Sequence, residues 1–274
     1  MKRAPRGVKP FDLSRVRTSP VRRRKSLVST GGFGRPSAPV AAVAAFLDSM
    51  PRFLGMESLR ALAAAVARSR KRGKGVAVAM GGHVVKTGCS PYIIDLMERG
   101  VVTSIALAGS TAIHDFETAL LGRTSEDVAE GLGEGAYGMA EETGAAFAAA
   151  AADAAARGKG LGRALGDAIQ GGRFPHRGLS LLGTASRLGI PATVHVAVGT
   201  DIVHMHPAAR GADIGEATFT DFRIACSVVA GLSGGAWINL GSAVVLPEVF
   251  LKALSLSRNL GHDVRDYVAM SDRG

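Results

Sequence analysis

Cysteine is scarce in this chain of 274 residues, where Cys89 and Cys226 are the only two and lie far apart. This excludes a disulfide framework and a Cys-x-x-Cys site, and it favours a reducing compartment. Aromatic residues are also few, at 5%. The frequent alanines and glycines let helices approach a sheet closely, which favours an α/β fold over an aromatic-rich β-sandwich.

Long apolar runs are missing as well. Glycine or a charged residue interrupts each run before it reaches the length of a membrane-spanning helix, as Asp153 does in the alanine-rich stretch 144–156. The basic start of the chain is not followed by the apolar core of a signal peptide. We therefore expect no membrane partner and a cytoplasmic location.

Acidic residues are nearly absent from residues 1–36, where Asp12 stands against eleven lysines and arginines. This segment alone accounts for the formal net charge of +10, so the rest of the chain is neutral on balance. We predict a basic N-terminal arm at residues 1–38 and an α/β domain at residues 39–274. Because the excess charge is confined to the arm, we expect it to be solvated or to wrap a partner subunit, and we do not expect nucleic-acid binding.

Short β-type runs alternate with helix-type runs in the domain. Runs typical of strands cover residues 76–80, 103–107, 192–198 and 236–240. Helical patterns cover 91–99, 112–121, 136–170 with a break at 157–160, 178–188, 218–230 and 247–259. Two further helices, 41–49 and 57–72, precede the first strand, and residues 122–135 read as a loop. This pattern predicts an α/β fold with a doubly wound, Rossmann-like, mostly parallel sheet and a helical N-terminal extension.

Four glycine-containing or polar corners follow these strands, at residues 81–88, 108–115, 199–206 and 241–247. In a parallel sheet all four lie at one edge. Five of the seven histidines fall in or beside these strands and corners, namely His83, His114, His195, His204 and His206. This density predicts a polar site at the carboxyl edge of the sheet.

Lys86 marks the first corner, where a strand breaks at glycines and continues as a helix. Glycines let the backbone approach a pyrophosphate, and helix N-termini and lysines favour anions. Asp201, at the end of a strand, could accept a hydrogen bond from a ribose hydroxyl, or it could cap the following turn. Nucleotide binding is therefore one interpretation, although GxGxxG and GxxxxGK[ST] are both absent.

Metal binding and nucleophilic catalysis, the latter by a lysine imine or by a triad, also stay open. His204 and His206 alternate, so on an extended segment both rings would face one side, and His114 and Asp115 could complete a metal site. Lys86 could form an imine if burial lowered its pKa. A triad of Ser110, His114 and Asp115 also stays open, although the GxSxG elbow is missing.

Taken in order, these corners resemble the deoxyhypusine synthase family, and most of all its bacterial members, some of which are homospermidine synthase-like. The resemblance is carried by GGHVVKTG, PYIIDLMERG, VVTSIALAG and AIHDFETAL within residues 76–121, by residues 189–201, which are similar to the family's "IP…TDGS" strand, and by NLGSAVV at 239–245, which is similar to its "GGGVVK" strand. It spans residues 57–259.

The resemblance implies a Rossmann-like fold, NAD as cofactor, an amine-bearing substrate such as a polyamine, and a homotetramer. It implies that residues 39–274 form a deoxyhypusine synthase-like domain. The expected catalytic residues are Lys86, His114 and Asp115, the last two facing the substrate cation. The expected cofactor-binding residues are Gly82, His83, Thr87, Gly88, Gly109, Ser110, Thr200, Asp201, Gly241 and Ser242, and no metal site is assigned.

Two departures from the family matter for the reaction. The family's catalytic lysine follows its "VV" pair, where this chain has Leu246, and the family's later "EFDGS" and tryptophan segment has no counterpart. The sequence therefore supports three hypotheses: an NAD-dependent enzyme that performs aminoalkyl transfer or a related redox step, a catalytically inactive NAD- or ligand-binding relative, and a metal-dependent hydrolase that uses the histidines.

Overall fold

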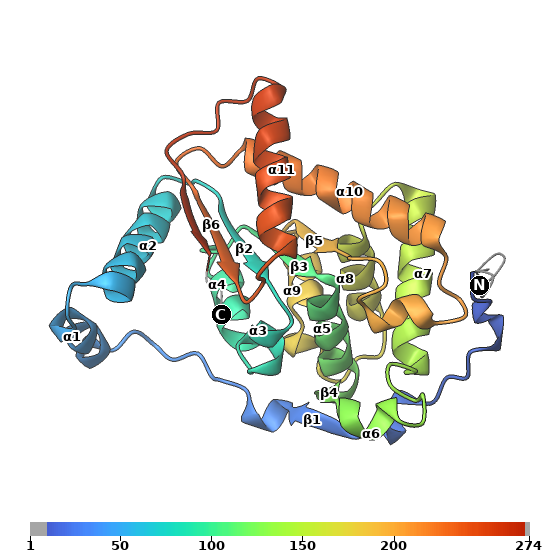
Figure 1. The fold of residues 1–274 in the computed structure, drawn as a ribbon. Coiled ribbons are helices and arrows are strands. Elements are labelled where there is room, and N and C mark those ends of the chain that lie inside the picture. Colours follow the sequence, from blue (N-terminus) through green and yellow to red (C-terminus); the bar gives the residue numbers. More distant parts are fainter. Residues whose placement is uncertain (1–9, 272–274) are drawn as a thin grey trace, which may run out of the picture.

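The computed structural model describes residues 10–271, and a five-stranded parallel sheet lies at its centre (Figure 1). The strands are β2 (Val76–Met80), β3 (Ser104–Ala108), β5 (Ala192–His195), β6 (Ala236–Leu240) and β7 (Val268–Ser271). Their order across the sheet is β5-β3-β2-β6-β7, and every neighbouring pair is parallel. Counted along the chain this is the order 3-2-1-4-5, with its switch point between β2 and β6. The predicted α/β, Rossmann-like fold is thus confirmed.

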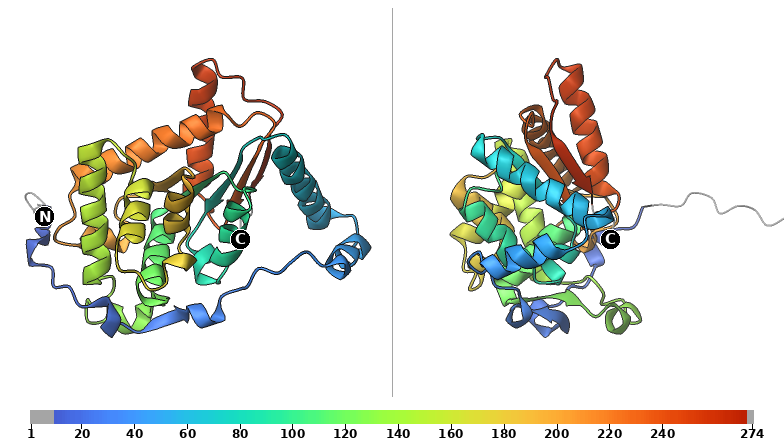
Figure 2. Two further views of the ribbon diagram at one scale, coloured as in Figure 1. Left: turned by 180° about the vertical axis from the view of Figure 1, so that it is seen from behind. Right: turned by 90° about the vertical axis from the view of Figure 1, so that its left-hand side faces the viewer.

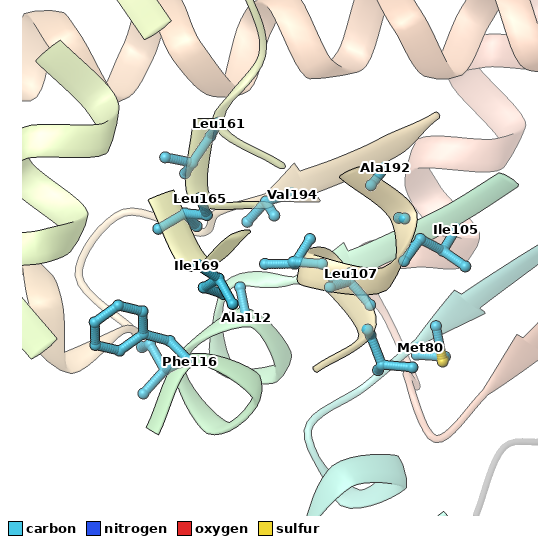
Figure 3. Packing of buried hydrophobic residues seen from close by; sticks show 14 of the residues in the cluster. Met80, Ile105, Leu107, Ala112, Phe116, Leu161, Leu165, Ile169, Ala192 and Val194 are labelled. Carbon is cyan, nitrogen blue, oxygen red and sulfur yellow. The ribbon is translucent and has the colours of Figure 1, made fainter. Parts of the chain in front are cut away.

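Helices cover both faces of the sheet. On one face, α10 (Gly211–Ala230) and α11 (Val245–Asn259) pack on Ala77 and Ala79. On the other, α4 (Ser90–Glu98), α5 (Gly109–Leu121), α7 (Glu141–Arg157), α8 (Leu161–Gly171) and α9 (Leu181–Leu188) form one apolar cluster with Val78 and Met80 (Figure 3). Since both faces of β2 are buried, its continuous apolar run replaces the alternation of a half-exposed strand.

Small residues bring α11 close to the sheet. The side chains of Ala77 and Ala79 leave room for Leu246 and Phe250, and Phe250 stacks on Trp237 with ring centroids 4.9 Å apart. Leu246, at the place of the family's lysine, is fully buried in this cluster. It is therefore a core residue of α11.

The helical N-terminal extension consists of α1 (Ala41–Ser49) and α2 (Leu54–Lys71). Helix α2 buries Leu62 and Ala65 and contacts β2, β6 and β7, whereas α1 buries no residue. In Figures 1 and 2 these helices lie at the β6–β7 end of the molecule, and α1 extends away from the body.

The N-terminal segment is docked along the domain from Ser19 onward. Strand β1 (Ser26–Ser29) pairs antiparallel with β4 (Arg123–Glu126), and the Ser19 amide donates to the Met139 carbonyl oxygen at 2.8 Å. Val21 is buried beside α7. The remaining short elements are α3 (His83–Lys86), α6 (Val128–Leu132) and the 3-10 turns η1 (Leu13–Arg15), η2 (Val21–Arg23), η3 (Thr30–Gly32), η4 (Arg177–Leu179) and η5 (Ile202–Met205). Residues 1–9 of the predicted arm lie outside the described residues.

Several elements differ from the sequence prediction. Strand β4 forms inside the expected loop 122–135, and β7 forms in the polar tail, of which residues 272–274 are outside the described part. Helix α10 begins at Gly211, seven residues early. Strand β5 ends at His195, because the Thr200 amide donates to the Ala197 carbonyl oxygen and Gly199 has a positive φ of 92°.

We find no helix within residues 10–271 that combines the length and the apolar character needed to cross a membrane.

Candidate functional site

A cavity of about 150 Å³ lies at the carboxyl edge of the sheet, where the chain leaves β2, β3 and β5. Its lining comes from α3, α5, η5 and the loop before η5, and from the N-terminal segment, β4, α6 and the loop after α6. The lining residues are Arg24, Lys86, Ser110, Ile113, His114, Glu117, Ser125, Glu126, Val128, Tyr137, Thr200, Asp201 and Ile202.

Five residues of the predicted site meet in this cavity: Lys86, Ser110, His114, Thr200 and Asp201. They come from three different corners, far apart in the sequence, which the parallel sheet brings to one edge. Ser110 and His114 are neighbours because they are four residues apart on α5.

Two predicted glycines lie directly beneath these side chains. A Cβ atom at Gly82 would lie 3.2 Å from Ser110 Oγ and 3.2 Å from His114 Cδ2. A Cβ atom at Gly109 would collide with the carboxylate of Asp201. Both glycines therefore make room for side chains of the site itself.

Besides Gly82, three predicted residues of the first corner lie outside the cavity lining: His83, Thr87 and Gly88. His83 belongs to α3, and its carbonyl oxygen accepts a hydrogen bond from Thr87 Oγ1 at 2.8 Å. Gly88 has a φ of 75°, and a Cβ atom there would lie 2.9 Å from Phe33 Cα, so the docked N-terminal segment requires this glycine.

The fourth corner also lies outside the cavity lining. The Gly241 carbonyl oxygen lies against Gly81, where a Cβ atom would collide with it. Ser242 Oγ accepts from the Leu246 amide at 3.2 Å, at the start of α11. Gly241 and Ser242 thus close the switch point between β2 and β6.

Asp115 does not face the cavity, which corrects the expectation that it faces a substrate cation. It is fully buried and accepts hydrogen bonds from Ser180 Oγ at 2.6 Å and from the amides of Leu181 and Leu182 at 2.6 and 3.0 Å. Burial raises its pKa to about 6 in spite of these bonds. Asp115 therefore holds the N-terminus of α9, on the face of α5 away from His114.

The histidine pair is also not arranged as an extended metal-binding segment. His204 lies in the 3-10 turn η5, and its Nδ1 accepts from the Gly199 amide at 3.2 Å, whereas His206 Nδ1 accepts from the Ala208 amide at 3.1 Å. In the described part of the chain, no group of three or more His, Cys, Asp or Glu side chains is placed to hold a metal ion.

Asp201 brings a buried, unpartnered oxygen to the cavity. Only 8% of the residue is exposed, and its Oδ2 atom is buried without a hydrogen-bond partner among residues 10–271. Burial raises its pKa to about 6. It lies against Gly109, the first residue of α5, where the helix dipole favours negative charge. A ligand that donates a hydrogen bond or carries a positive charge would satisfy this oxygen.

His114 is held neutral. Burial lowers its pKa to about 4; the nearby Glu117 opposes this shift, and Lys86, Arg24 and His83 reinforce it. At neutral pH the ring therefore carries one proton and offers one nitrogen as an acceptor.

The sequence interpretation missed Arg24, Glu117, Thr124 and Glu126. Glu117 could have been found from the sequence, because it follows His114 by three residues on a predicted helix and therefore lies on the same helix face. Thr124 and Glu126 fall in the predicted loop. Arg24 lies 93 residues before Glu117, and no local pattern connects the two.

Comparison with known proteins yields distant structural similarity. No family model matches the chain, and no curated protein matches it in sequence. Similar solved structures include the arginine dihydrolase ArgZ from cyanobacteria (13% identity, TM-score 0.48, 81% of this chain) and the ternary complex of AgrE with ornithine and NAD⁺ (14%, 0.46, 70%). The chain spans only 31% of ArgZ and 25% of AgrE. A candidate deoxyhypusine synthase from Entamoeba histolytica is also similar (14% identity, TM-score 0.39, 70% of this chain and 77% of that one).

Proposed function

We propose that the protein binds NAD at the carboxyl edge of its sheet and uses it to oxidise an amine-bearing small molecule. The observation that carries the NAD site is the unpartnered Asp201 Oδ2 atom at the start of α5, in the 3-2-1-4-5 parallel sheet. A ribose hydroxyl is a donor of suitable size for this oxygen.

The other residues of the cavity suit parts of the same cofactor. Lys86 lines the cavity and forms no ion pair within residues 10–271, so its ammonium group is available to a phosphate. Ser110, in the first turn of α5, offers a backbone amide and a hydroxyl. A cavity of about 150 Å³ holds part of a dinucleotide, and we propose that the rest lies along the sheet edge towards Gly81 and Gly241.

A redox step on an amine is the chemistry we favour. Bound NAD would accept a hydride from the carbon next to the substrate nitrogen, and the N–H proton would pass to the neutral His114 ring, which leaves an imine. Glu126 lines the same cavity and provides a carboxylate for a substrate cation. Aminoalkyl transfer through a lysine at the family's position is not part of this proposal, because Leu246 is a core residue.

Calorimetric titration with NAD⁺ tests the cofactor site. We expect binding by the wild-type protein and at least ~10-fold weaker binding by Asp201→Ala and Lys86→Ala, since each loses one direct contact, about 1.4 kcal/mol. Asp263→Ala and Lys252→Ala remove exposed residues of the same types and should leave the affinity unchanged. Absence of binding, or equal affinity in all variants, would contradict the proposal.

A non-catalytic NAD-binding relative is the second candidate, favoured by Leu246. An assay of NADH formation with a panel of diamines and polyamines distinguishes this candidate from the proposed enzyme. The enzyme hypothesis predicts NADH with at least one amine, and the non-catalytic hypothesis predicts NAD⁺ binding without it.

We further propose that the chain is a homo-oligomer, a tetramer by resemblance. Large apolar side chains on α1 and at the start of α2 are exposed, among them Val43, Phe46, Phe53 and Leu54. Such a patch is typical of an interface. Light scattering should give a multiple of 28.2 kDa for the wild type and a lower mass for Phe46→Asp with Phe53→Asp. The exposed Leu260→Asp serves as control.

A further inference from the structure

A continuous line of polar contacts connects the N-terminal segment to the ring of His114. Arg24 Nη2 lies 2.7 Å from Glu117 Oε2, and Thr124 Oγ1 lies 2.6 Å from the same oxygen. The other side of the Thr124 hydroxyl lies 2.8 Å from His114 Nδ1. Glu117 and Thr124 are both buried, so water does not compete for these bonds.

Counting hydrogen atoms along this line determines the state of the ring. Glu117, as the carboxylate paired with Arg24, can only accept, so the single hydroxyl hydrogen of Thr124 is donated to it. Thr124 Oγ1 can then only accept from His114, and the hydrogen in that bond must come from Nδ1. The neutral ring is therefore protonated at Nδ1, and its Nε2 carries the free lone pair.

That free nitrogen belongs to the cavity. His114 lines it, and Nε2 has no hydrogen-bond partner within residues 10–271. Gly82 leaves space beside it, since a Cβ atom there would lie 3.6 Å from Nε2. A substrate in the cavity can reach this face of the ring, whereas Nδ1 is turned towards β4.

We propose that His114 is the proton acceptor of the cavity through Nε2, and that Thr124, Glu117 and Arg24 are positioning residues that hold its ring in the Nδ1–H tautomer. When a substrate N–H bond breaks, its proton joins Nε2 and its electron pair stays on the substrate nitrogen. The resulting imidazolium keeps its Nδ1–H bond to Thr124, whose hydroxyl continues to donate to Glu117. The Glu117 carboxylate thus stabilises the positive ring through one hydroxyl group.

Arg24 gives the N-terminal segment a part in the site. The β1–β4 pairing, in register from Ser26–Glu126 to Ser29–Arg123, brings Arg24 over α5. Ser125, next to Thr124, has a φ of 67°, a left-handed conformation that ordinary residues rarely adopt. Such strain is found where the surrounding structure must aim side chains, here Thr124 towards α5.

The use of His114 as a base rests on the proposed function, but its tautomer does not. NMR of protein labelled with ¹⁵N-histidine reports which ring nitrogen carries hydrogen, without NAD or substrate. The His114 signals are assigned by their loss in His114→Gln. We expect a protonated Nδ1 and an unprotonated Nε2 at neutral pH in the wild type, and a protonated Nε2 would overturn the proposal with no variant needed.

Variants then test the positioning residues. Thr124→Val cannot accept from Nδ1–H, so the His114 ring should lose its fixed tautomer, whereas Thr124→Ser keeps the hydroxyl and should restore the wild-type signals. Thr193→Val is the matched control: Thr193 Oγ1 lies 2.9 Å from His195 Nε2, so this variant should shift only His195. Unchanged His114 signals in a folded Thr124→Val protein would contradict the proposal.

Measurements of turnover distinguish a failure of the proposed function from a failure of the proposed role of His114. If an amine substrate is found, His114→Gln should abolish NADH formation and leave NAD⁺ affinity within ~2-fold, and Thr124→Val should lower kcat with KM unchanged. Full turnover by His114→Gln would show that His114 is not the proton acceptor. Failure of NAD⁺ to bind the wild type would refute the proposed function and leave the tautomer result standing.

Discussion

Arg24 and Glu117 form an ion pair of 2.7 Å in which the two side chains are only 9% and 1% exposed. A residue of the basic N-terminal segment is thereby built into the polar core around α5. Within residues 10–271, the remaining hydrogen bonds to Glu117, from Thr124 and from Thr143 at 3.2 Å, come from neutral hydroxyls. Arg24 is thus the partner that compensates the buried negative charge.

Replacing Arg24 with methionine should therefore destabilise the protein by about 3 kcal/mol, because a buried carboxylate is left without its cation. The neighbouring Lys25→Met is the control. Lys25 is more than half exposed in its pairs with Asp127 and Glu130, so its loss should cost much less than the loss of Arg24. Urea unfolding measures the free energy of unfolding of both variants. Equal losses would show that the buried Arg24–Glu117 pair stabilises the protein no more than an exposed pair does.

Asp201→Asn should change the pH dependence of stability. The pKa of Asp201 is raised from 3.8 to about 6 in the folded protein, so its contribution to stability is fully present below the unfolded value and is lost as pH rises through 6. The ionised carboxylate then costs about 3 kcal/mol. Relative to wild type, Asp201→Asn should gain roughly that amount between pH ~4 and pH ~8. A pH-independent difference in urea unfolding would argue against an unpaired buried charge.

The sheet and its edge could be predicted from the sequence because they depend on local signals. The run Val76–Met80 is apolar without alternation, and glycines and polar residues follow it directly. The alternation of such runs with helices predicts parallel strands, and parallel strands bring their carboxyl ends to one edge. Lys86, His114 and Asp201 meet in one cavity for this reason.

The direction of each side chain could not be predicted in the same way. His114 and Asp115 are adjacent, yet one faces the cavity and the other holds α9, because successive residues of a helix point about 100° apart. Strands β4 and β7 are four residues long, and their partners β1 and β6 are not adjacent to them in the sequence. These segments form strands because they pair with those partners, and their local propensity does not predict it. The Arg24–Glu117 contact depends on that pairing.

Asp115→Ala should affect stability and leave ligand binding intact. The substitution leaves the amides of Leu181 and Leu182 and the Ser180 hydroxyl without their buried acceptor. Such losses cost about 1–3 kcal/mol per group, so we expect a strong drop in the free energy of unfolding. NAD⁺ affinity, measured on the folded fraction at low temperature, should match wild type. If Asp115→Ala lost as much NAD⁺ affinity as Asp201→Ala, Asp115 would be part of the binding site after all.

Gly81→Ala should be destabilising although the added group is a single methyl. The Cβ atom would collide with the Gly241 carbonyl oxygen, which belongs to the backbone between β6 and α11 and cannot rotate away as a side chain can. Moving β2 and β6 apart would disturb the parallel pairing of Met80 with Leu240, so we expect a loss of about 1–3 kcal/mol. Gly215→Ala is the matched control, because Gly215 lies inside α10 with nothing within 4 Å of a Cβ atom. There the same change should stabilise the protein by about 0.5–1 kcal/mol through higher helix propensity. Thermal unfolding of both variants should therefore shift in opposite directions, and equal shifts would mean that the contact between Gly81 and Gly241 does not hold the switch point closed.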